Sequence, residues 1–196
     1  GVPPCRTEGS DNVTRHPARV AFVPDILADL ARRDFTVNAM AYDGKGLLDP
    51  HGGQADLEAK LLRCVGSPAV RFEEDALRIL RLYRFMAVLG FAAEAKTQRG
   101  AEAAAPTVGA LSRERVRGEM DWILASEKPQ VLQGLIEYGG LAAYGLKGAH
   151  NLAPLAEVPT AALVRWWAFA ALCAADIDVM AYQCGFSKHD APKLQE

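Results

Sequence analysis

The sequence has few cysteines and histidines, and none of them has the spacing of metal ligands. The four cysteines, Cys5, Cys64, Cys173 and Cys184, lie far apart and form no Cys-x-x-Cys pair, and the four histidines form no His-Glu-x-x-His motif. This pattern argues against a zinc site and against a disulfide framework. It predicts free thiols in a reducing cytoplasm.

Long apolar runs and an excess of one charge are also missing. The longest unbroken apolar run, Trp166 to Ala175, is far below the roughly 20 residues that span a bilayer. No signal-peptide pattern is visible either, so we expect a cytoplasmic protein without a membrane partner. The 22 basic and 24 acidic residues give a net charge of −2. Nucleic-acid binding would therefore depend on a local basic patch.

The chain has enough apolar residues for a substantial core. Of its 196 residues, 50% are hydrophobic and 23% are charged, as in ordinary globular proteins with one large or two small domains. Short strand-like patterns come before about residue 60, and helical patterns follow. The sequence therefore predicts an α+β fold that continues into an all-helical region. The expected elements are a loop at 5–19, strands within 19–24, 35–43 and 44–49, helices within 24–35 and 49–66, and helices at about 73–90, 112–126, 128–139, 160–175 and 187–196.

One expected helix carries charged residues at every third position, namely Asp75, Arg78, Arg81 and Arg84. Arg78 can pair with Glu74, four residues before it, whereas Arg81 and Arg84 have no acid three or four residues away. The apolar residues of this helix fall on the opposite side. The stripe is either a solvated helix face or a site for an anion that the chain itself does not supply.

Three sequence blocks around this stripe resemble those of a known enzyme family. They are "RRDFTVNA" (32–39), "EDALR" (74–78) and "RLYRF" (81–85). In order and spacing they are similar to the class II tRNA nucleotidyltransferases (CCA-adding enzymes) and bacterial poly(A) polymerases, over roughly residues 5–125. The resemblance implies the C-terminal part of a nucleotidyltransferase head domain, the remnant of its palm sheet, at 1–60, a helical neck that recognises the nucleotide base at 61–125, and a helical RNA-binding body at 126–196.

The resemblance implies template-independent addition of C and A to the 3′ end of tRNA, from CTP and ATP. Asp75 and Arg78 would read the base, Arg81 and Arg84 would suit the triphosphate, and Arg33 would also contact the nucleotide. Two alternatives stay open. One is a bacterial poly(A) polymerase that adds A to RNA 3′ ends, and the other is a non-catalytic RNA-binding relative. The "NAMAY" and "DPHGG" segments favour tRNA as the substrate, and intact "RRDFT" and "EDALR" blocks favour an enzyme.

The resemblance also implies catalytic Mg²⁺ held by a pair of carboxylates. These ligands are expected before Gly1, so the chain by itself is expected to be incomplete and inactive. Asp176 and Asp178 have the Asp-x-Asp spacing of such a pair, but they lie in the helical region, where side chains two positions apart point in different directions. Asp34 and Asn38 either order the "RRDFT" corner or contact the ribose. The segment 6–17 matches a flexible loop that the family's A-adding members retain.

Overall fold

The computed structural model of the chain contains two compact units, Gly1–Ser67 and Pro68–Glu196. Each unit has its own internal packing. The structure describes residues 5–8, 20–23, 26–42, 46–146, 148, 151–175 and 177–186.

The first unit is a small mixed α/β arrangement with short strands. β1 pairs antiparallel with β2, and β3 pairs antiparallel with β4. The 3-10 helix η1 packs on α2, and Phe35 of the "RRDFT" block is fully buried just before it. The elements are β1 (Cys5–Glu8), β2 (Val20–Val23), α1 (Ile26–Ala31), the 3-10 helix η1 (Thr36–Asn38), β3 (Ala41–Tyr42), β4 (Leu47–Leu48), α2 (Gly53–Glu58) and β5 (Leu61–Leu62).

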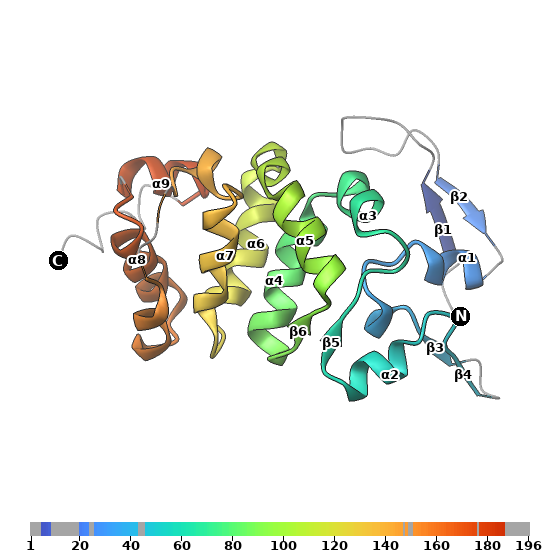
Figure 1. Cartoon of the computed structure of the whole chain (residues 1–196). Coiled ribbons are helices and arrows are strands. Elements are labelled where there is room, and N and C mark those ends of the chain that lie inside the picture. Colours follow the sequence, from blue (N-terminus) through green and yellow to red (C-terminus); the bar gives the residue numbers. More distant parts are fainter. Residues whose placement is uncertain are drawn as a thin grey trace. The chain divides into compact units, whose positions relative to one another are not determined.

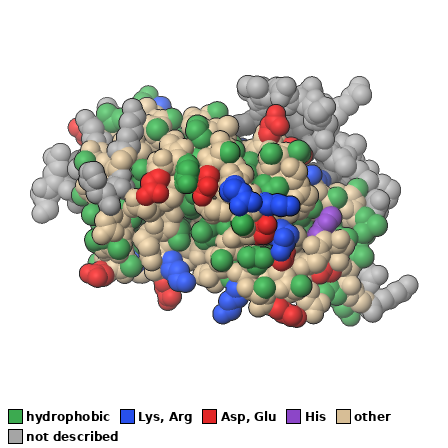
Figure 2. Space-filling model, viewed as in Figure 1, with side chains coloured by type: hydrophobic (Ala, Val, Ile, Leu, Met, Phe, Trp, Pro, Cys, Tyr) green, Lys and Arg blue, Asp and Glu red, His purple; other side chains and the backbone are tan. Residues whose placement is uncertain are grey.

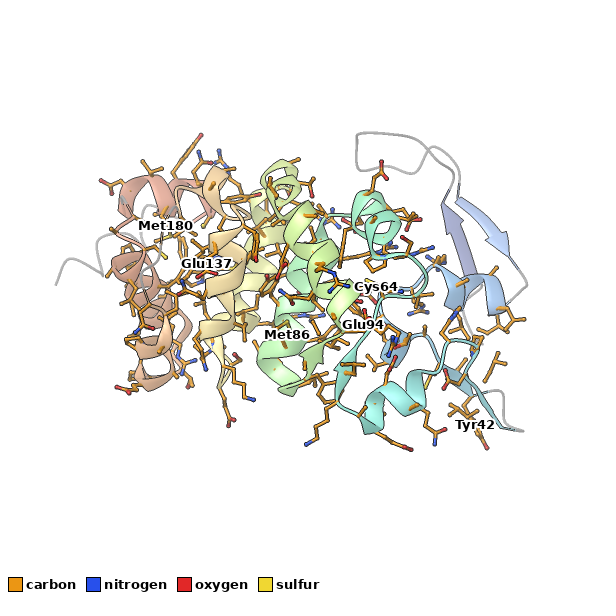
Figure 3. All side chains as sticks on the ribbon, viewed as in Figure 1. Tyr42, Cys64, Met86, Glu94, Glu137 and Met180 are labelled. Carbon is orange, nitrogen blue, oxygen red and sulfur yellow. The ribbon has the colours of Figure 1, made fainter. Side chains whose placement is uncertain are left out.

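The second unit is almost entirely helical, and its helices lie in successive layers from α4 to α9 (Figure 1). Large side chains such as Met120, Trp166 and Phe169 are buried between them, as is Met180 on α9 (Figure 3). The elements are α3 (Pro68–Glu74), α4 (Leu77–Leu89), β6 (Ala92–Ala93), α5 (Ala95–Ala104), η2 (Ala105–Ala110), α6 (Arg113–Leu124), η3 (Pro129–Val131), α7 (Leu132–Glu137), η4 (Ala142–Tyr144), η5 (Ala153–Glu157), α8 (Ala162–Leu172) and α9 (Ile177–Gln183).

The predicted α+β class is confirmed, and most of the predicted helices are present with shorter ends. Some local predictions are wrong. The segment 5–8 is a strand instead of part of a loop, because its backbone pairs with β2, and the strand expected at 35–43 begins with the 3-10 turn η1. The rest of the predicted loop, with most of the segment proposed for A addition, and the helix at 187–196 lie outside the described residues.

Gly53 is needed where α2 approaches η1. A Cβ atom at this position would lie 2.2 Å from the carbonyl oxygen of Thr36. The same turn is fixed by Asp49, whose carboxylate accepts hydrogen bonds from the backbone N–H groups of Gly53 and Gln54 at 2.7 and 2.9 Å. These contacts hold the "DPHGG" segment against the end of the "RRDFT" block.

We expect Gly53→Ala to destabilise the protein by about 2 kcal/mol, the usual cost of overpacking against a rigid neighbour. The clash is with backbone, so it cannot be relieved by a change of rotamer. Urea unfolding followed by circular dichroism measures the loss. Gly46→Ala is the matched control, because nothing lies within 4 Å of its added Cβ. Equal stability of the two variants would contradict the expectation.

The visible face in Figure 2 carries basic and acidic side chains with hydrophobic ones between them. In the described part of the chain, no helix is both long and apolar enough to cross a membrane. Because basic and acidic side chains are mixed on this face, binding of a polyanion there would depend on the positions of individual arginines and lysines more than on net charge.

Candidate nucleotide-binding site

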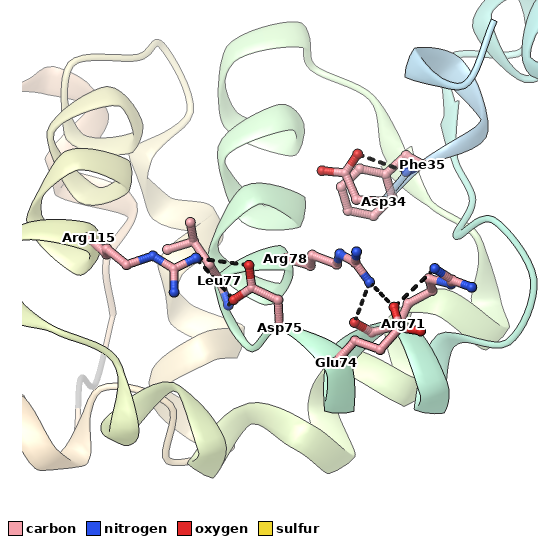
Figure 4. Close-up of polar contacts among 8 residues, drawn as sticks. All are labelled: Asp34, Phe35, Arg71, Glu74, Asp75, Leu77, Arg78 and Arg115. Carbon is pink, nitrogen blue, oxygen red and sulfur yellow. Dashed lines mark hydrogen bonds and ion pairs between the residues drawn. The ribbon is translucent and has the colours of Figure 1, made fainter. Parts of the chain in front are cut away.

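The helix expected at 73–90 is interrupted at Asp75. This residue lies between α3 and α4, and its carboxylate oxygen Oδ1 accepts a hydrogen bond from the backbone N–H of Leu77 at 3.0 Å (Figure 4). A short acidic side chain that binds the backbone two residues on favours a turn over a continuous helix. The break places Arg78 in the first turn of α4.

Asp75 is also bound by an arginine that no pattern along the chain singles out. Arg115, in the first turn of α6, donates from Nη2 to both carboxylate oxygens of Asp75, at 3.1 and 2.8 Å (Figure 4). Both side chains are about one-third exposed. An ionised carboxylate can accept about four hydrogen bonds. The contacts from Leu77 and Arg115 use three of these positions and leave one for a ligand donor.

Arg78 is held on the other side of the same corner. Its Nη1 atom donates to Glu74 at 2.5 Å and to the backbone carbonyl of Arg71 at 3.0 Å (Figure 4). The predicted pairing of Arg78 with Glu74 is therefore confirmed. Glu74 also binds the Arg71 side chain at 3.0 Å. The Arg78 side chain is only 16% exposed, and its guanidinium is fixed by α3, whereas Asp75 is fixed by α6.

The prediction that Arg84 lacks an acidic partner is wrong. Its Nε atom lies 2.8 Å from Oε2 of Glu119 on α6, and both side chains are mostly buried. No local spacing could reveal this partner, because Glu119 belongs to another helix. The guanidinium groups of Arg84 and Arg81 also lie over the ring of Phe85, at 4.7 and 5.5 Å from its centroid. The arginine stripe thus borders the seam between α4 and α6.

Arg33 lies in the first unit, just after α1, and its side chain is 48% exposed. Its Nη2 atom pairs with Oδ2 of Asp29 at 2.8 Å, and Arg32 pairs with the other oxygen. Burial of Asp29 favours its neutral form, but the hydrogen bonds from Arg33 and Arg32 outweigh this effect and lower its pKa. The guanidinium of Arg33 is thus anchored by Asp29, while about half of the side chain is exposed.

Asp34 and Asn38 order the corner that follows. Asp34 is buried, and its Oδ1 atom accepts a hydrogen bond from Asn38 Nδ2 at 2.6 Å. The same oxygen accepts a hydrogen bond from the backbone N–H of Phe35 at 3.0 Å (Figure 4). Of the two roles considered for these residues, the ordering role has direct contacts. Contact with a ribose stays a prediction.

Within the described residues, no group of three or more His, Cys, Asp or Glu side chains comes together as a metal site would require. Asp178 lies in the first turn of α9, and Asp176 falls outside the described residues. The described residues therefore do not supply the ligand set of a catalytic metal.

The chain is similar to proteins of one enzyme family. Residues 1–63 match the Poly A polymerase head domain family. The chain is 41% identical over 140 residues to the CCA-adding enzyme of Geobacillus thermodenitrificans. The aligned region covers 71% of this chain and 35% of that protein. It is 40% identical over 164 residues to the CCA-adding enzyme of Geobacillus kaustophilus. Here the aligned region covers 82% of this chain and 39% of that protein.

The fold is similar to the crystal structure of the Bacillus stearothermophilus CCA-adding enzyme in complex with CTP. The TM-score is 0.83 at 30% identity, and the match covers 98% of this chain and 49% of that one. The predicted family, the class II CCA-adding enzymes and related poly(A) polymerases, is thereby confirmed. The chain spans between 35% and 39% of the length of these two Geobacillus relatives.

Proposed function

We propose that the protein containing this chain adds C and A nucleotides to the 3′ end of tRNA, from CTP and ATP, without a nucleic-acid template. The observation that carries the proposal is the corner between α3 and α4. There, Asp75 and Arg78 are three residues apart and are each fixed by a separate partner, Arg115 and Glu74. Support also comes from the relatives, which are CCA-adding enzymes.

In this proposal the corner replaces a template strand. Cytosine and adenine both present an amino donor beside a ring-nitrogen acceptor, which matches an Asp acceptor beside an Arg donor. Uracil and guanine present the reverse pattern, so that buried polar groups would be left unpaired. Asp75, with about one acceptor position left, would receive the amino group, and Arg78 would donate to the ring nitrogen.

We assign the remaining nucleotide contacts to Arg33, Arg81 and Arg84. Guanidinium groups suit phosphate oxygens because they offer planar, paired donors. Arg84 would have to bind phosphate while it keeps or exchanges its ion pair with Glu119. Arg33, anchored by Asp29, has a side chain that is more exposed than that of Arg84 or Arg78.

CCA-adding enzymes are nucleotidyltransferases, which typically use divalent metal ions. We propose Mg²⁺ as the ion, with ligands outside the described residues. We further propose that 1–60 belongs to the head, 61–125 to the neck and 126–196 to the body, and that the protein acts in the cytoplasm, where tRNA, CTP and ATP are its partners.

The test is nucleotide addition by the full-length protein to three tRNA substrates that lack the last one, two or three nucleotides. The proposal expects incorporation of C, C and A in turn from CTP and ATP, and little from UTP or GTP. Addition of long A tails to RNA in general would instead identify a poly(A) polymerase. Binding of RNA without incorporation would identify a non-catalytic relative.

We expect Arg115→Ala to raise the KM for CTP by about tenfold, because the Asp75 carboxylate loses the charged donor that holds it in place. Loss of such a partner costs about 1–3 kcal/mol. The variant should also accept more UTP, since a mobile acceptor selects the base less strictly. Arg115→Lys should restore part of both effects by keeping one charged donor. Steady-state kinetics with CTP and UTP measure the change. An Arg115→Ala variant that loses stability but keeps its C-to-U ratio would reduce Arg115 to a packing role.

A further inference from the structure

Two arginines share one carboxylate at the corner between α3 and α4. Oε2 of Glu74 accepts hydrogen bonds from Nη1 of Arg78 at 2.5 Å and from Nη1 of Arg71 at 3.0 Å (Figure 4). Arg71 precedes Glu74 by three residues on α3, whereas Arg78 follows it by four residues on α4. The position of the carboxylate therefore depends on both guanidinium groups, one from each helix.

The side chain of Arg71 is mostly buried around this contact. It is only 17% exposed, and its Nε atom is buried without a hydrogen-bond partner among the described residues. A buried N–H group without a partner is unfavourable for folding. Stability by itself therefore does not account for an arginine at this position, and its contact with Glu74 links it to the base-reading corner.

Glu74 is the most exposed of the three side chains, at 43% compared with 16% for Arg78. A glutamate with this exposure keeps rotamer freedom and can turn its carboxylate to water, which weakens a single ion pair. The second guanidinium, from Arg71, limits that freedom. Since Nη1 of Arg78 donates to Oε2 of Glu74 as well as to the backbone carbonyl of Arg71, a fixed Glu74 also fixes Arg78.

We propose that Arg71 is a positioning residue for base selection, which fixes Glu74 and through it the direction in which Arg78 donates to the base. The inference rests on the proposed function, in which Arg78 is the donor that selects C and A. Arg71 itself does not contact the nucleotide in this arrangement. A cation in the last turn of α3 also interacts favourably with the helix dipole. That role would change stability without changing base selection.

The experiment measures the ratio of kcat/KM for CTP to that for UTP in the full-length protein with Arg71→Met. This change removes the guanidinium that binds Glu74 but keeps the backbone carbonyl that binds Arg78. The ratio should fall by about threefold to fivefold, the effect of one partly exposed ion pair. Arg71→Lys should restore part of it by keeping a charged donor. Arg99→Met, at an exposed arginine on α5, is the matched control and should leave the ratio unchanged.

A double-mutant cycle with Glu74→Gln separates positioning from a general effect on the fold. If Arg71 acts through Glu74, Arg71→Met should lower the ratio little further once Glu74→Gln is present, because the two changes disrupt the same contact. Ratios that fall by the same factor in both backgrounds would overturn the proposal. So would an Arg71→Met protein that loses stability in urea but keeps the wild-type ratio.

A second readout does not depend on catalysis. Calorimetric titration with CTP and with UTP should show a smaller preference for CTP in Arg71→Met than in the wild type. If the wild type adds no nucleotide to tRNA but shows this change in preference, the proposed function fails and the positioning role stands. If the wild type adds C and A, and Arg71→Met selects bases as the wild type does, the positioning role fails and the proposed function stands.

Discussion

Arg78→Ala is expected to remove most of the selection of C and A over U and G. The lost side chain is the donor half of the proposed base-reading pair, and a good bidentate contact is worth about 1–3 kcal/mol of discrimination. The ratio of kcat/KM for CTP to that for UTP should therefore fall by roughly 5- to 150-fold. Single-nucleotide addition to tRNA by the full-length protein measures the ratio directly.

Arg78 also joins α4 to α3, so this variant needs controls for structure. Arg78→Lys keeps a positive charge but loses the planar pair of donors, and it should lose discrimination almost as fully as the Ala variant. Glu74→Gln weakens the same contact while it leaves the guanidinium in place, and it should lose less. A C-to-U ratio that stays at the wild-type value in Arg78→Ala would rule out the base-reading role.

Arg165→Met is expected to lower the free energy of unfolding by about 3 kcal/mol or more. Arg165 on α8 is buried, and its guanidinium donates to the carbonyl oxygens of Val158 at 3.0 Å, Leu124 at 2.7 Å and Ser126. Methionine fills a similar volume but leaves these acceptors without their donor. Each buried group that loses its partner costs about 1–3 kcal/mol, and a domain has only about 5–15 kcal/mol of stability in total.

Chemical denaturation of both proteins measures this loss. Arg99→Met is the matched control, because Arg99 is exposed on α5, and surface substitutions usually change stability by less than about 0.5 kcal/mol. Equal stability of the two variants would show that the three carbonyl groups find water or other donors. A selective loss in Arg165→Met would identify Arg165 as the side chain that ties α8 to the end of α6.

The arginine stripe shows how far a sequence pattern can be followed. The pairing of Glu74 with Arg78 was predictable, because residues four apart on a helical turn are neighbours whatever the tertiary structure. The interruption at Asp75 was not predicted, although the signal was present: a short acidic side chain next to a helix start often binds the following backbone N–H groups. The three family blocks were sufficient to identify the family, because each is a short run of residues that can be read directly along the chain.

The sequence by itself determined the α+β class, the positions of α6 and α8 to within a few residues, and the family, because these depend on local periodicity and on local blocks of residues. Only the tertiary structure decided which charges pair across helices. Arg115 pairs with Asp75, 40 residues away in the sequence, and the acid that pairs with Arg84 is Glu119 on α6. Such partners depend on how helices pack, and packing is set by the whole buried surface instead of by any spacing along the chain.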